Sequence, residues 1–552
     1  MPLRFPSLTG VVPSWGHPAE DAPSETEQYF HVRQERKKLF PRAVLVGLAA
    51  GAVTVGFRIA LAAAHALRNA VVDWAHLYPV GGWAIPVVFG AVGAAASVWL
   101  VRAYAPEAAG SGVPHVEGVL HRLRELRPGR LIPVKFVGGL LALGSGLALG
   151  REGPSVQLGS AVGALTADRI GSPSRDRQTL IAAGAGAGLA AAFNAPLAGL
   201  IFILEEVQRD FRPLIFGATF IAAAVATTVS QLVSGPFPVF EVVSYPVPPV
   251  ALLAVFALVG LLCGALGSLF NRSLIGSLDL ADRLAPTTGR AVGLAALVGG
   301  TVGLVAWVSP DVVGGGHDIS ETILDADVAL TAIPLLFGLR FLLTVSSYGT
   351  GAPGGIFAPL LVLGALVGLA VGHGAVLAFP ASGAAPGAFA VVGMAAFFAA
   401  VVRAPLTGLV LIVEMTGSYA LMLPLLIACF CAYVLAESLH TPPIYEELLE
   451  RDLARNGITP AHEPVVVEYE VEPDAPFAGR TIRELGLPRG CVIVTLRNGT
   501  HEVIPQADTQ LLPYTRVTAI IAPDAEDAHE RLRAGLSSSR SLALPLAETE
   551  DA

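Results

Sequence analysis

The stretch GREGPSVQLGSAVG (150–163) decides the fold, because its pattern returns as GGIFAPLLVLGALVG (354–368). Pro154 is followed by glycines five and nine residues later, and Pro359 is followed by glycines at the same two spacings. A second pair comes after it: GAGAGLAAAFNAPLAGLIFILEE (184–206) matches GMAAFFAAVVRAPLTGLVLIVEM (393–415). The pairs keep their order and are offset by 205 and 209 residues. Duplicated halves are typical of transporter folds, whose substrate sites lie near the membrane midplane where interrupted helices meet.

The composition is that of a polytopic membrane protein. Of 552 residues, 53% are apolar and 14% are charged, and the mean hydropathy is +0.63, whereas soluble domains carry about 25% charged residues. Apolar runs at 41–64, 213–235, 248–270 and 291–308 are near the roughly 20 residues that a bilayer-spanning helix needs. The net charge of −9 gives no sign of nucleic-acid binding. We therefore expect an all-α membrane protein in a lipid bilayer.

The polarity of the chain predicts five segments. They are a polar N-terminal segment (1–30), a membrane domain (31–450), a linker (451–462), a small soluble α/β domain (463–523) and a flexible tail (524–552). In the soluble part, VVVEYEV (465–471) and CVIVTL (491–496) predict strands, and Thr481 with Glu484 predicts a capping box. Asn498-Gly499 predicts a hairpin turn. The basic run RQERKK (33–38) before the first apolar run predicts a cytoplasmic N-terminus.

Three glycine-rich stretches predict helix N-termini inside the protein: GSGVP (110–114), GREGP (150–154) and GGIFAP (354–359). Glycine lets backbone N–H groups approach a ligand, and proline in the first turn sacrifices no hydrogen bond. The free N–H groups and the positive end of a helix dipole attract an anion. The anion-site loops would be formed by Gly110, Gly112, Gly150, Gly153 and Gly355.

Glu152 stands in the first turn of one of these helices, among apolar segments. Its carboxylate can occupy the position of an anion when ionised and leave that position when protonated, so we interpret Glu152 as a gate. The alternative is an ordinary acidic residue that stabilises its helix N-terminus by roughly 0.3–1 kcal/mol. Ionisable groups inside a membrane are functional by default, which favours the gate. We interpret Arg151 as electrostatic or structural support.

The repeat separates two adjacent acids at the end of PLAGLIFIL (196–204). Glu205 corresponds to Glu414, whereas Glu206 corresponds to a methionine. We therefore expect symmetric structural roles for Glu205 and Glu414, such as accepting backbone N–H bonds. Glu206 is left as the acid without a counterpart and could pass protons to Glu152. Its alternative is a solvated glutamate at a helix end.

Other polar residues lie in or near apolar surroundings. Glu117 and Lys135 could form a buried ion pair. Ser111 offers a hydroxyl between two glycines, and Tyr445 offers a phenol at the end of the membrane domain. On sequence alone Tyr445 could equally be a tyrosine of the interfacial belt.

Taken together, GSGVP, GREGP, FNAPLAG with two glutamates, GGIFAP and the late tyrosine resemble the CLC family of chloride channels and proton-coupled chloride transporters. The resemblance covers roughly residues 31–450. It implies a homodimer with one anion pathway in each subunit, built from an inverted repeat of tilted, broken helices. It also implies that Ser111, Tyr445 and the amides of Ile356 and Phe357 hold the central anion.

The same resemblance implies that Glu152 is the external gating and proton-accepting residue and that Glu206 is the internal proton residue. Ser111 favours chloride, since family members that prefer nitrate tend to have proline there. Glu206 favours a Cl⁻/H⁺ antiporter, and the alternative is a passive gated chloride channel. An intramembrane enzyme is disfavoured because no HExxH or GxSxG element with a base is found.

Residues 463–523 resemble TrkA-C domains, whereas many family members carry CBS domains at this place. This resemblance implies a possible nucleotide or cyclic-dinucleotide regulator, although a purely structural role is an equal alternative. Beyond that regulator, we expect no cofactor, no metal and no nucleic-acid partner, with chloride and protons as substrates. We expect a multi-pass protein of a prokaryotic plasma membrane, with both termini in the cytoplasm.

Overall fold

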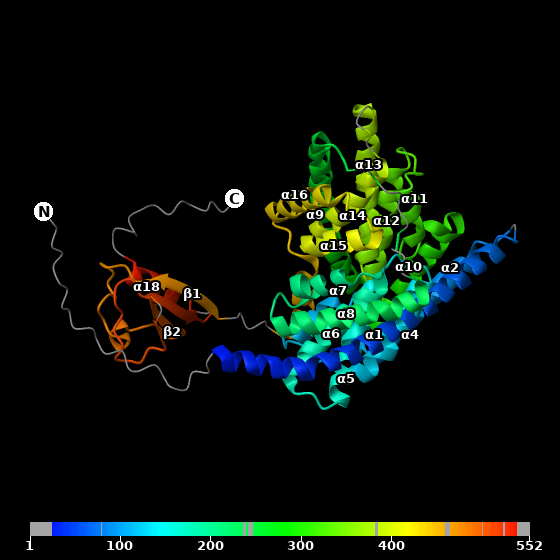
Figure 1. Cartoon of the computed structure of the whole chain (residues 1–552). Helices are drawn as coiled ribbons and strands as arrows, with labels where there is room; N and C mark the ends of the chain where they lie inside the picture. The colour runs from blue at the N-terminus through cyan, green and yellow to red at the C-terminus, as the bar shows by residue number, and fades with distance from the viewer. Residues whose placement is uncertain are drawn as a thin grey trace. The chain divides into compact units, whose positions relative to one another are not determined.

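The computed structural model describes residues 25–78, 80–235, 239–240, 245, 247–380, 383, 385–458, 464–499, 501–522 and 525–537. The chain divides into two compact units, Met1–Arg455 and Asn456–Ala552. The first unit is helical, and the second contains a small sheet (Figure 1). Most of the N-terminal segment expected at 1–30, and the end of the tail expected at 524–552, lie outside the described residues.

The first half of the membrane unit is a series of helices that differ widely in length. They are α1 (Glu25–Ala75), α2 (Ala84–Tyr104), η1 (Pro106–Ala108), α3 (Val113–Leu120), α4 (Pro128–Gly144), α5 (Glu152–Arg169), α6 (Ser174–Phe193), α7 (Pro196–Phe202), the π-helical turn η2 (Ile203–Val207) and α8 (Pro213–Ser234).

The second half repeats this series. It consists of η3 (Val250–Leu252), α9 (Leu253–Leu284), α10 (Thr288–Val308), η4 (Pro310–Val312), α11 (His317–Leu324), α12 (Ile333–Gly349), α13 (Phe357–Ala378), α14 (Pro386–Val402), α15 (Pro405–Thr416) and α16 (Met422–Ser438). A last helix, α17 (Ile444–Arg455), ends the unit.

The predicted repeat is present in the backbone. Helix α5 packs on α6 as α13 packs on α14, and the loops after α6 and α14 turn at Asn194 and Arg403, both with positive φ (56° and 69°). These residues stand two before Pro196 and Pro405, which begin α7 and α15. The repeat also extends to α3 and α11, which follow left-handed glycines at Gly112 and Gly316. Corresponding parts of the two halves therefore fold alike down to single backbone angles.

The repeat glycines let the helices cross closely. A methyl group on Gly159 would lie 3.0 Å from the Cα of Gly188 and would also overlap the carbonyl of Gly184. At Gly364 in the second half, the same addition would meet the carbonyl carbon of Gly393 at 2.8 Å. The obstacle is backbone rather than a movable side chain, so these positions require glycine.

Two carboxylates tie the halves together reciprocally. Glu205 accepts the N–H groups of Leu406 (3.0 Å) and Thr407 (2.7 Å) at the start of α15. Glu414 accepts the N–H groups of Leu197 (3.1 Å) and Ala198 (2.7 Å) at the start of α7, and α7 lies next to α15 (Figure 1). In a twofold contact, residue i meets j and j meets i. The exchange is the symmetric arrangement expected of this pair and relates the halves by a pseudo-twofold axis.

Several helices are long and apolar enough to cross a membrane. They are Lys37–Ala75, Ala84–Tyr104, Pro213–Ser234, Val250–Leu284, Thr288–Val308 and Phe357–Ala378. Each of the four apolar runs singled out in the sequence lies inside one of these helices to within two residues. Helices α12, α14, α15 and α16 are also apolar but shorter, as expected of broken helices that lie inside the protein.

The second unit is a four-stranded antiparallel sheet in the order β1-β4-β2-β3. Its strands are β1 (Val465–Glu470), β2 (Cys491–Asn498), β3 (His501–Val503) and β4 (Arg516–Ile521), with a short helix η6 (Ile482–Leu485). The two predicted strands, the capping box and the hairpin are present. The domain boundary differs, because α18 (Glu526–Leu536) lies in the segment expected to be a flexible tail. Its Ala528, Leu532 and Leu536 are buried in the core of this unit, which holds the helix in place.

Candidate functional site

The three glycine-rich loops meet. Gly150 and Gly355 exchange two backbone hydrogen bonds, each 2.7 Å, in an isolated antiparallel bridge. The N–H of Gly354 donates to the carbonyl of Gly110 at 3.0 Å. A methyl group on Gly153 would lie 2.7 Å from the carbonyl oxygen of Ser111. The helices α3, α5 and α13 therefore begin within a few ångströms of one another, as the sequence predicted.

Glu152 lies where α5 and α13 begin. Its side chain is 3% exposed, and a methyl group on Gly150 would meet both a carboxylate oxygen of Glu152 and the amide nitrogen of Ala358, the latter at 3.2 Å. The guanidinium Nε of Arg151 lies 4.0 Å from Oε1 of Glu152. Oε2 has no hydrogen-bond partner among the described residues. The carboxylate thus occupies the positive N-terminal end of α13, where an anion would be attracted.

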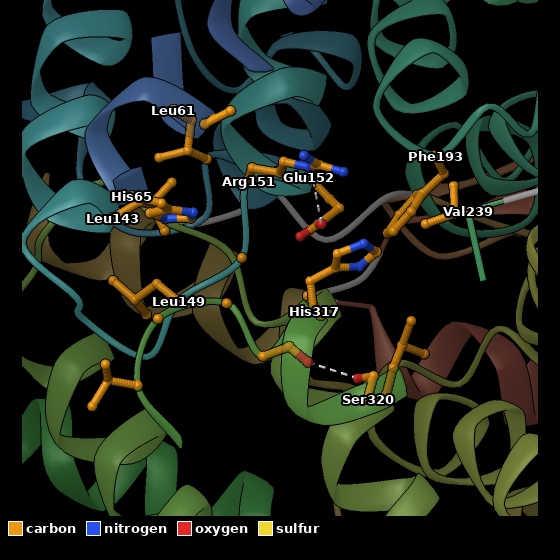
Figure 2. Close-up of a pocket in the computed structure, with 18 of the residues that line it drawn as sticks. Leu61, His65, Leu143, Leu149, Arg151, Glu152, Phe193, Val239, His317 and Ser320 are labelled. Carbon is orange, nitrogen blue, oxygen red and sulfur yellow. Dashed lines mark hydrogen bonds and ion pairs between the residues drawn. The ribbon is translucent and has the colours of Figure 1, made fainter. Parts of the chain in front are cut away.

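Glu152 opens onto a cavity of about 210 Å³. Figure 2 shows Glu152 and the ring of His317 pointing into this cavity, with Arg151 beside the carboxylate. A second cavity of about 140 Å³ is lined by Ser111, His115 and Tyr348. In the part of the chain that the structure describes, no residue lines both cavities. Glu152 and Ser111 therefore line two separate cavities.

Several polar groups near the three helix starts are buried and have no hydrogen-bond partner among the described residues. The hydroxyls of Ser111 and Tyr445 lie within electrostatic range of one another, yet neither makes a well-formed hydrogen bond with any described residue. The ring of Tyr445 stacks on Phe357 with centroids 6.3 Å apart. Within the described ranges neither the backbone N–H of Ile356 nor that of Phe357 donates a hydrogen bond. Buried polar groups are normally paired, so this collection of free donors is suited to an anion.

Two buried cations hold the loops that precede α3 and α11. Nζ of Lys135 donates to the carbonyls of Ala108 (2.9 Å) and Gly110 (2.8 Å). The guanidinium of Arg340 donates to Val312 (2.9 Å) and Gly314 (2.8 Å). Both side chains are fully buried. Lys135 and Arg340 thus make equivalent contacts in the two halves.

The expected ion pair between Glu117 and Lys135 is wrong. Lys135 is directed to backbone carbonyls, and Glu117 instead faces Arg209, with Nη2 and Oε1 3.6 Å apart. Carbonyl oxygens of a glycine loop can approach a buried ammonium closely, and they satisfy its donors without a counter-ion. Sequence spacing alone gives no signal for this choice.

Glu205 and Glu206 point to different surroundings, as adjacent residues on a helix must. Glu205 binds the start of α15, whereas Glu206 is buried within η2 and its Oε1 has no partner among the described residues. A π-helical turn such as η2 is often found at a functional site. The phenol of Tyr445 lies within electrostatic range of both Glu206 and Glu152.

Sequence reasoning missed three residues of this region: Arg340, Tyr348 and His317. A repeat signal could have found Arg340, because it stands 205 residues after Lys135, the offset of the first repeat pair. Tyr348 accepts a hydrogen bond from the N–H of Ser111 at 3.4 Å, and His317 lines the cavity of Glu152. For these two only the tertiary structure gives a signal.

Comparison with known proteins agrees with this geometry. Residues 92–437 match the family model described as voltage gated chloride channel, and residues 466–533 match the TrkA-C domain. The H(+)/Cl(-) exchange transporter ClcA of Cronobacter sakazakii is 42% identical over 419 residues, which cover 75% of this chain and 89% of the relative. The transporter of the same name from Vibrio cholerae is 41% identical over 420 residues, with 74% and 89% coverage.

Solved structures agree as well. A slow cyanobacterial Cl-/H+ antiporter superposes with a TM-score of 0.73 at 35% identity, covering 76% of this chain and 99% of the antiporter. A eukaryotic CLC transporter superposes with a TM-score of 0.65 at 26% identity, covering 82% of this chain and 79% of the transporter. The chain therefore belongs to the CLC family of voltage-gated chloride channels and transporters, and a TrkA-C domain follows its membrane unit.

Proposed function

We propose that this chain exchanges chloride for protons across a membrane. The observation that carries the proposal is the carboxylate of Glu152, which occupies the N-terminal end of α13 where the three glycine loops meet. The relatives named above are H(+)/Cl(-) exchange transporters, which favours exchange over a passive channel and over an intramembrane enzyme.

In this proposal the anion site is made of neutral groups. The hydroxyls of Ser111 and Tyr445 and the amides of Ile356 and Phe357 donate to chloride, while Lys135 and Arg340 fix the loops from behind. Because the donors carry no full charge, they bind chloride weakly enough for it to be released again. The loop glycines Gly110, Gly112, Gly150, Gly153 and Gly355 permit the close approach of the three helix starts.

Glu152 couples the two substrates. As a carboxylate it competes with chloride for the end of α13, and when it takes up a proton it loses its attraction to the helix dipole and leaves. In this proposal the proton comes from Glu206, and both acids are within electrostatic range of the phenol of Tyr445. Arg151 supports the ionised form through the 4.0 Å contact with Glu152.

Simultaneous recording of both ions in liposomes tests the proposal. With purified protein and an imposed chloride gradient, we expect protons to move uphill as chloride flows down its gradient. Chloride flux without uphill proton movement would instead identify a passive gated channel. Glu152→Gln should abolish proton movement while chloride flux persists, because an amide cannot accept the proton. Proton pumping by Glu152→Gln would overturn the role given to this residue.

We further propose that the protein is a homodimer of the cell membrane with both termini in the cytoplasm, and that its TrkA-C domain binds a nucleotide or cyclic dinucleotide. The basic run at 33–38 supports the orientation of the N-terminus, and the family match at 466–533 supports the regulatory module. Thermal-shift titration of the full chain with ATP, AMP and cyclic di-AMP tests the ligand. A flat response to all three would leave the domain a structural role.

A further inference from the structure

A group of charged residues lies next to Glu206 on α3, on the segment after η2 and on α17. Arg209 is 3.6 Å from Glu117 and 3.5 Å from Glu446, and it is within electrostatic range of Glu206. Arg209 has a positive φ of 50°, an unfavourable conformation for a residue other than glycine. Its side chain is 40% exposed, and its guanidinium contacts Glu117 and Glu446 at the edge of solvent.

The two inner acids of this group are buried and incompletely paired. The side chain of Glu117 is 4% exposed, and Glu206 as a whole residue is 3% exposed. Oε2 of Glu117 and Oε1 of Glu206 have no hydrogen-bond partner in the described part of the chain. One guanidinium cannot neutralise three carboxylates, and excess negative charge in a poorly hydrated place is costly. A proton that reaches this group is therefore held there.

Glu446 is the outer member of the group. Its side chain is 42% exposed, so it can exchange protons with water while it contacts Arg209. It follows Tyr445 in the chain, and it is within electrostatic range of Glu206. A carboxylate that is half in water and half in a buried acid cluster has the position of a proton-collecting group.

We propose that Glu446 collects protons from water and delivers them to Glu206. The O–H bond of the Glu446 carboxylic acid breaks, and an O–H bond forms on the carboxylate of Glu206. The proton passes between the two residues either along intervening water or by way of Glu117. Glu446 is left as a carboxylate and takes its next proton from water, so the step is balanced. Arg209 lies 3.5 Å from this carboxylate. This inference rests on the proposed exchange of chloride for protons.

Glu447 supplies a matched control. Both acids lie in the first turn of α17, where a carboxylate stabilises the helix through its dipole. The electrostatic neighbours of Glu447 are Glu450, Arg451 and Asp279 rather than Arg209 and Glu206. A purely structural role in the helix would therefore be shared by both residues, and a role in proton delivery would belong to Glu446 alone.

The test compares Glu446→Gln, Glu446→Asp, Glu447→Gln and the unchanged full chain in liposomes, with chloride and proton fluxes recorded together. For Glu446→Gln we expect a loss of proton flux of roughly tenfold, with chloride flux kept within about twofold. This loss is smaller than the 10²–10⁴ typical of an acid or base in direct contact with the reacting group, because water can bypass Glu446. Glu447→Gln should match the unchanged chain, and Glu446→Asp should restore proton flux.

Equal proton fluxes in Glu446→Gln and the unchanged chain would overturn the inference. So would an equal loss of both fluxes that aspartate does not rescue, since that result indicates a structural role. Glu446→Ser replaces the glutamine variant if the latter does not elute as a monodisperse protein on gel filtration. Failure of the unchanged chain to move protons would instead contradict the proposed function itself, so the two failures are distinguishable.

Discussion

Glu205 and Glu206 are adjacent in the chain, and the same substitution at the two positions is expected to have opposite effects. Glu205 accepts the N–H groups of Leu406 and Thr407, and it also accepts the hydroxyl of Thr407 at 2.7 Å. In Glu205→Gln the amide oxygen can replace one carboxylate oxygen, but the amide NH₂ must then face a second donor. The start of α15 loses hydrogen bonds to a charged group as a result.

The magnitude follows from this count of contacts. A hydrogen bond to a charged group contributes roughly 1.5–3 kcal/mol, and of the three such bonds one is lost while the other two are weakened. We expect Glu205→Gln to destabilise the protein by about 2–4 kcal/mol, and Glu414→Gln to cost somewhat less because Glu414 accepts no hydroxyl in addition. Glu206→Gln should cost little, because an oxygen of Glu206 is buried without a partner among the described residues.

Two measurements on the same purified variants check this prediction. Thermal unfolding, followed by gel filtration of heated samples in detergent, reports stability, and paired chloride and proton recording in liposomes reports coupling. Glu205→Gln should unfold at a lower temperature and keep its coupling ratio, whereas Glu206→Gln should keep its stability and lose proton movement. If Glu205→Gln remained stable and lost coupling, or if Glu206→Gln kept coupling, the separation of roles drawn from the repeat would be wrong.

Two further predictions concern stability. The backbone N–H of Thr481 donates to the Glu484 carboxylate at 2.9 Å and, with the Thr481 side chain, holds the pKa of Glu484 below its ordinary value of 4.5. The stabilising contact is therefore fully present above pH 4.5 and is lost as the pH falls through the lowered pKa of Glu484. Hydrogen exchange of the η6 amides in the full chain, corrected for intrinsic rates, should therefore become faster on acidification. Glu484→Gln should remove most of this dependence, and equal acid sensitivity in both proteins would contradict it. Gly159→Ala should destabilise the protein by about 1–3 kcal/mol through overpacking at the α5–α6 crossing. Gly56→Ala, with open space around the added methyl group, should be neutral or stabilising in thermal unfolding, and a Gly159→Ala variant as stable as this control would refute the close crossing.

The sequence by itself determined the repeat, the three helix starts and the difference between Glu205 and Glu206. Each of these features depends on the spacing of residues along the chain. Proline and glycine set the conformation of the backbone next to them, so their positions predict local structure without knowledge of distant contacts. The capping box and the two strands of the second unit were predicted for the same reason. The equivalence of Lys135 and Arg340 is also present in their spacing of 205 residues.

Only the tertiary structure decided which charges meet. Lys135 turns to the carbonyls of the loop before α3, Glu117 faces Arg209, and Glu446 joins them from α17. These contacts join residues up to 237 positions apart, as from Arg209 to Glu446, and no local preference selects among the available partners. Likewise α18 is polar enough to be read as a tail, and it is ordered because the sheet buries its apolar residues. Pairing of charges and burial of a weakly apolar helix depend on three-dimensional neighbours, which spacing along a chain does not specify.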